Sequence, residues 1–128
     1  MAERQRSQRF QDLLVWRKAH ELVIALYCYV KGLPSSEAYG LPILLKRAAV
    51  SVPANIAEGF ERSGKADKAR CMNIAAGSLE EALYYLVLAA DLSYGKTDTL
   101  LNSLDEISRL LHAYSRAILS SVSCLPSS

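Results

Sequence analysis

The sequence predicts an all-α protein, an up-down-up-down antiparallel four-helix bundle. Apolar residues recur with gaps of three and four positions over four long segments, which is the period of a helix with one buried face. Short connections join these segments, and none of them alternates between apolar and polar residues as a strand does. With 128 residues, the chain is long enough for one domain with its own core. We expect that core in residues 10–120, after a disordered basic tail at 1–9 and before a flexible tail at 121–128.

The first helix is expected over residues 13–31. Asp12 precedes it and belongs to a residue type that caps the free amides of a first turn, while Gly32 and Pro34 end it. Its apolar stripe consists of Val15, Ala19, Leu22, Leu26, Tyr29 and Leu33.

The second helix is expected over residues 41–60, and it is the most informative segment. Its apolar stripe consists of Leu41, Leu45, Ala48, Val52 and Ile56. Beside this stripe, Arg47, Ser51, Asn55 and Glu58 form one polar ridge on the helix surface. We interpret the ridge as a network of inter-helix hydrogen bonds and an ion pair, in preference to a catalytic site. Because Arg47 and Glu58 are too far apart to pair with each other, we expect Glu80 or Glu81 beside Arg47, and Arg70 beside Glu58.

The third and fourth helices follow the same pattern. The third is expected from Lys65 to about residue 90, and residues 91–97 form a loop before the fourth, which Thr97 or Asp98 caps. The expected stripe of the third helix is Met72, Ala76, Leu79, Leu83, Leu86 and Ala90. That of the fourth is Leu100, Leu104, Ile107, Leu111, Tyr114 and Ile118.

The net charge of +2 does not by itself identify a partner, but the positive charges are unevenly placed. Two segments, 1–18 and 62–70, are locally basic and suit a polyanion such as RNA, although a solvated tail and helix start can have the same composition. The candidate phosphate contacts are Arg4, Arg6, Arg9, Arg17, Lys18, Arg62, Lys65 and Lys68.

The sequence lacks the usual signatures of enzymes, metal sites and cofactor sites. The Glu-x-x-His pattern of di-iron bundles is missing, since His20 and His112 each follow an arginine at i−3. Cys28, Cys71 and Cys124 fit no metal-binding spacing, and their odd number favours reduced thiols. The longest apolar run, residues 82–90, is too short to span a bilayer. We therefore predict a cytoplasmic protein that is not an enzyme and needs no metal or cofactor.

Three stretches carry a resemblance to a known family. They are Phe10-x-Asp12-Leu13-x-Val15-Trp16-x-Lys18-Ala19, Tyr39-Gly40-Leu41 with the run from Arg47 to Gly59, and Ala75-x-Gly77-Ser78-Leu79-x-Glu81. From Phe10 to about Leu119, the chain resembles the four-helix-bundle proteins of 23S ribosomal RNA intervening sequences. The resemblance implies a ring of subunits, a pentamer, and brings no catalytic residues. The family is also similar to accessory proteins of diversity-generating retroelements, which are more basic pentameric bundles that bind a reverse transcriptase and nucleic acid.

Two hypotheses for function follow. In the first, the protein is a homo-oligomer that binds RNA or a ribonucleoprotein through its basic segments. In the second, it is a protein-interaction scaffold that binds no nucleic acid and uses apolar anchors, for which the candidates are Trp16, Tyr27, Tyr29, Tyr84 and Tyr85.

Overall fold

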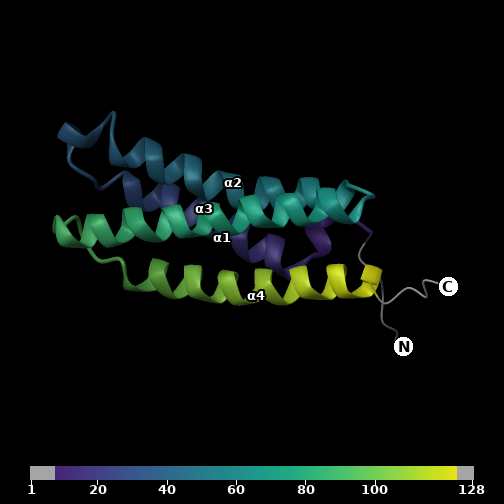
Figure 1. The fold of residues 1–128 in the computed structure, drawn as a ribbon. Coiled ribbons are helices and arrows are strands. Elements are labelled where there is room, and N and C mark those ends of the chain that lie inside the picture. The colour runs from purple at the N-terminus through teal and green to yellow at the C-terminus, as the bar shows by residue number, and fades with distance from the viewer. Residues whose placement is uncertain (1–7, 124–128) are drawn as a thin grey trace.

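The computed structural model describes residues 8–123, with side chains through residue 120, and confirms the predicted four-helix bundle. A 3₁₀ turn, η1 (Phe10–Asp12), leads into α1 (Leu14–Val30), and a second, η2 (Ser35–Glu37), lies in the connection to α2 (Leu41–Glu61). The helices α3 (Lys65–Asp91) and α4 (Asp98–Ser123) complete the bundle. Each helix packs against its sequence neighbours, and α4 closes the bundle against α1 (Figure 1).

The core confirms three of the four predicted stripes. The second-helix stripe is buried throughout, as are the first four positions of the stripes in α1 and α4. In α3 the buried positions are Cys71, Met72, Ala75, Ser78, Leu79, Ala82, Leu86 and Ala89. The predicted Leu83 and Ala90 are therefore wrong as core positions, since both are exposed, whereas Ala76 is partly buried against the core. Leu83 lies beside α4 instead, where it lines a hollow together with Leu101 and Leu104.

Small residues bring α2 and α3 close together. Gly59 of α2 faces the start of α3, where an added Cβ would lie 2.5 Å from Met72 Cε and 3.0 Å from Cys71 Cβ. Cys71 itself is fully buried. Lys68 completes this contact from α3, because its Nζ donates to the carbonyl oxygens of Gly59 at 3.0 Å and Phe60 at 3.2 Å. These carbonyls belong to the last turn of α2, so Lys68 acts as a C-terminal cap.

The predicted start of the first helix is wrong in one respect. Asp12 does not cap it, since its carboxylate accepts hydrogen bonds from the backbone amides of Gln8 at 3.1 Å and Arg9 at 3.2 Å. Asp12 thus closes η1, and α1 begins at Leu14 without a side-chain cap. At the other terminus, α4 continues to Ser123, three residues beyond the predicted boundary at residue 120.

The loops that follow α1 and α3 lie at one end of the bundle and are joined by a chain of hydrogen bonds. Tyr29 Oη donates to the carbonyl oxygen of Tyr94 at 2.7 Å, and Tyr94 Oη donates to Glu37 Oε2 at 2.8 Å. The other carboxylate oxygen of Glu37 accepts from the backbone amide of Leu41 at 3.4 Å. The α1–α2 and α3–α4 connections are therefore fixed to each other.

Candidate nucleic-acid interface

The two basic segments of the sequence meet at one end of the bundle. Figure 1 shows η1 at the same end as the turn between α2 and α3, and η1 contacts both α1 and α2. Segments that are about fifty residues apart in the chain are thereby joined in one region, which we call the basic end. Arg4 and Arg6 lie outside the described residues.

Within the first basic segment, two of the three described candidates also have structural contacts. The guanidinium of Arg17 donates through Nη1 to the carbonyl oxygens of Asp12 at 3.0 Å and Gln11 at 3.4 Å, which holds η1 against α1. Lys18 forms an ion pair of 3.8 Å with Glu106 of α4. Arg9 is exposed.

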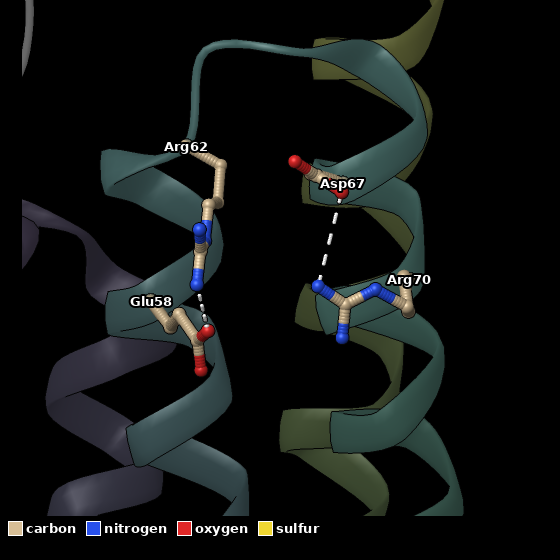
Figure 2. Close-up of polar contacts among 4 residues, drawn as sticks. All are labelled: Glu58, Arg62, Asp67 and Arg70. Carbon is tan, nitrogen blue, oxygen red and sulfur yellow. Dashed lines mark hydrogen bonds and ion pairs between the residues drawn. The ribbon is translucent and has the colours of Figure 1, made fainter.

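The two arginines of the second basic segment each form an exposed ion pair. Arg62 pairs with Glu58 at 2.5 Å, and Arg70 pairs with Asp67 at 3.8 Å (Figure 2). The hydrogen bond from Arg62, its positive charge and, more weakly, the charge of Arg70 hold the pKa of Glu58 below its usual value. The expected Glu58–Arg70 ion pair is therefore wrong, because Arg62 lies one turn away on the same helix and reaches the carboxylate first. Lys65 is exposed at the start of α3.

The polar ridge of α2 lies along the outer side of its seam with α3. Ser51 Oγ accepts hydrogen bonds from Ser78 Oγ of α3 at 2.7 Å and from Asn55 Nδ2 at 3.1 Å, and Asn55 also donates to the carbonyl oxygen of Ser51 at 2.8 Å. The predicted inter-helix hydrogen bond is confirmed at Ser51. Its partner Ser78 is buried. Ser78 was not identified from the sequence as part of the polar network.

Arg47 has a different environment from the one expected. It lines a hollow of about 310 Å³ on the α2–α3 surface, together with Glu81 and Tyr85. Within the part of the chain that the structure describes, however, Arg47 forms no ion pair, and neither does Glu80 or Glu81. The expected pairing is wrong because Arg47 is exposed and needs no buried counter-charge.

An uncharged band crosses the middle of the same surface. Residues 48–57 of α2 and 71–79 of α3 contain no Asp, Glu, Lys or Arg. The Ser51–Ser78 hydrogen bond places the two stretches side by side. The band is also apolar at its surface, since Val50 and Ile74 are each 41% exposed. At Gly77 nothing lies within 4 Å of an added Cβ, so the α3 backbone is open to close approach.

Sequence reasoning also missed Arg116. This exposed residue lines a groove of about 750 Å³ between α3 and α4, next to His112. It shares this groove with Met72 and Asn73, which follow closely after the second basic segment in the sequence. No signal in the sequence identified Arg116, because it lies outside the two basic segments and only the fold brings it close to the second.

Residues 8–123 contain neither a metal-binding cluster nor a membrane-spanning helix. Within this range, no group of three or more His, Cys, Asp or Glu residues is arranged to hold a metal ion. No described helix has the length and apolarity required to cross a membrane. The absence of enzymatic activity stays a prediction.

Comparison with known proteins supports the fold and the family. The family model for 23S rRNA-intervening sequence proteins matches residues 11–113. Among solved structures, the chain is similar to a protein of unknown function from the S23 ribosomal protein family of Bacteroides thetaiotaomicron. The two are 24% identical, with a TM-score of 0.75 over 83% of this chain and 98% of the other. No curated protein matches the chain.

Proposed function

This chain belongs to the 23S rRNA-intervening sequence protein family, and we propose that it is a homo-oligomeric bundle that binds RNA through phosphate contacts at the basic end. The observation that carries the proposal is the meeting of the two basic segments at one end of the fold. Phosphate contacts require placed positive charge and no base-specific geometry. A surface of this kind is therefore sufficient for binding that does not depend on sequence.

The ion pairs at the basic end are compatible with this role. Arg62 and Arg70 retain 44% and 56% of their side-chain exposure while paired. Exposed ion pairs contribute little net stability, so a phosphate can replace Glu58 or Asp67 at small cost. Lys68 differs from them, because its Nζ is already bound to two carbonyl oxygens. We assign Lys68 a structural role, and assign phosphate contacts to Arg9, Arg62, Lys65, Arg70 and Arg116.

The uncharged band supports self-association. An apolar surface without charges is unfavourable in water and is typical of the centre of a subunit interface. Within the band, the side chains of Ser51, Asn55 and Ser78 are hydrogen-bonded to one another, so covering these three side chains costs little. A ring, for which the family resemblance favours five subunits, would present several basic ends to one RNA and strengthen weak contacts by avidity.

The second candidate function is a scaffold that binds another protein and no nucleic acid. Exposed aromatic side chains favour it, chiefly Tyr39 at 92% and Tyr84 at 59% exposure. Tyr39 was not among the anchors predicted from the sequence. Of those besides Tyr84, Tyr27 is 43% exposed, whereas Trp16, Tyr29 and Tyr85 are half-buried against the core. This alternative predicts binding that does not weaken steeply with salt.

Charge reversal at matched positions tests the RNA proposal. Lys65→Glu with Arg70→Glu changes two exposed residues at the basic end, and Lys31→Glu with Lys96→Glu makes the same change at the opposite end. Loss of two phosphate contacts should make the negative slope of log K against log salt shallower by roughly 1.4 for single-stranded RNA. The control pair should keep the wild-type slope. Equal effects of the two pairs would contradict a localised site.

A further inference from the structure

A stack of aromatic rings lies on α1 beside the basic end. The indole of Trp16 and the imidazole of His20 are stacked, with ring centroids 4.9 Å apart and planes 9° apart. Phe10 of η1 also contacts Trp16, with ring centroids 5.1 Å apart and planes tilted by 59°. The three rings form a continuous aromatic group that begins in η1 and continues one turn along α1.

The outermost ring of this stack is exposed and has further binding capacity. Trp16 is half-buried against the core, whereas His20 is exposed. Among the described residues, Trp16 is the only ring in contact with His20, and no hydrogen bond or ion pair engages the imidazole nitrogens. Because Trp16 covers one face of the imidazole, the opposite face points away from it along α1. Ile24, four residues further along α1, is itself 58% exposed.

We propose that His20, supported by Trp16, is a stacking site for an unpaired base of the bound RNA. Proteins hold single-stranded nucleic acid by combining a positively charged surface with aromatic rings on which bases stack. Both components are present here, since the exposed Arg9 adjoins Phe10 in the sequence. The inference rests on the proposed function and deepens it, because it identifies the RNA as single-stranded at this point.

The physical basis distinguishes this site from phosphate binding. A base in a duplex is stacked between its neighbours and is not available to His20, whereas a base in a single strand is. Phosphate contacts at the basic end serve both forms of RNA. The aromatic stack should therefore add affinity only for the single strand.

The test uses the full chain and two histidine variants. The protein contains two histidines, both exposed, so His112→Ala on α4 is a matched control for His20→Ala. The probes are a single-stranded oligouridylate and an RNA duplex of similar charge, at low salt. The single tryptophan, Trp16, reports the site directly through its fluorescence.

The inference predicts that the single strand quenches Trp16 fluorescence. It also predicts that His20→Ala weakens single-strand binding about tenfold, that His20→Phe restores it, and that duplex binding is unchanged. His112→Ala should resemble the wild type. Salt-sensitive RNA binding with equal affinities for His20→Ala and His112→Ala would overturn the stacking site and leave the proposed function intact. Absence of RNA binding by the wild type at low salt would overturn both. A smaller oligomer for His20→Ala would assign His20 to a subunit contact and would also overturn the stacking site.

Discussion

Ser51 of α2 and Ser78 of α3 are joined by a hydrogen bond of 2.7 Å between their hydroxyl groups. This bond fixes the register of the two helices that share the most extensive contact in the bundle. Ser78→Ala removes the donor, so we expect a loss of about 1 kcal/mol in the free energy of unfolding. Chemical denaturation of Ser51→Ala, Ser78→Ala and the double variant measures the coupling. Strictly additive effects would show that the bond does not stabilise the fold.

Gly59 is required for the close approach of α2 and α3. In Gly59→Ala, the new Cβ would lie 2.5 Å from Met72 Cε and 3.0 Å from Cys71 Cβ, so we expect a loss of about 1–3 kcal/mol from overpacking. Thermal or urea unfolding measures the loss. Because the nearest atom is the end of a flexible side chain, Gly59→Ala combined with Met72→Ala should cost less than the sum of the two single changes. A loss for the double variant that equals or exceeds this sum would show that the strain does not come from the contact with Met72.

Gly77 tests the uncharged band. In a single subunit, a side chain at this position meets nothing within 4 Å, and a glycine in a helix costs about 1 kcal/mol relative to alanine. We therefore expect Gly77→Leu to keep the subunit folded but to reduce the oligomer mass, because the added side chain would block a close approach of the next subunit. Analytical ultracentrifugation checks this result.

The matched control is Glu80→Leu, which also adds a leucine to an exposed position of α3 but lies outside the band. It should leave the oligomer mass unchanged. An unchanged mass for Gly77→Leu would remove the band from the subunit interface.

Tyr94 makes stability depend on alkaline pH. The hydrogen bond that its hydroxyl donates to Glu37 raises the pKa of Tyr94, and burial and the carboxylate charge add to the shift. A raised pKa in the folded state means that the unfolded state loses its proton first. The stabilisation is fully present below the ordinary tyrosine value of about 10 and is lost as pH rises through the folded-state pKa. Denaturation from pH 8 to 11.5 should show this decline.

Tyr94→Phe should reduce the decline without abolishing it, because burial also raises the pKa of Tyr29 and of Tyr114. An identical pH dependence in Tyr94→Phe and the wild type would exclude a contribution from the Tyr94–Glu37 bond.

Periodicity predicted most of the fold because three helices have one apolar stripe each. It failed in α3 because two apolar stripes lie one residue apart there. The predicted stripe contains Leu83 and Ala90, whereas the buried stripe contains Ala82 and Ala89. Which of the two stripes is buried depends on contacts between helices, and these are not visible in either sequence segment alone. The misplaced cap at Asp12 has a local cause, since an aspartate can accept from amides on either side of a turn.

The candidate site was predicted less well than the fold. Residue type and spacing correctly selected Ser51 and Asn55 as hydrogen-bonded, but the partner Ser78 lies 27 residues away. Lys68 was selected for its charge, although its contacts with Gly59 and Phe60 make it a helix cap. Charge is visible in a sequence, whereas the distance from a charge to a carbonyl oxygen is set by the fold.

The most direct test of the central claim is light scattering on one sample of the protein, with and without single-stranded RNA, at low and at physiological salt. We predict that the protein without RNA has a mass several times the 14.1 kDa of one chain. We also predict that RNA is bound at low salt and largely released at physiological salt. An oligomer that does not bind RNA at low salt would contradict the nucleic-acid role and would favour the protein-interaction scaffold.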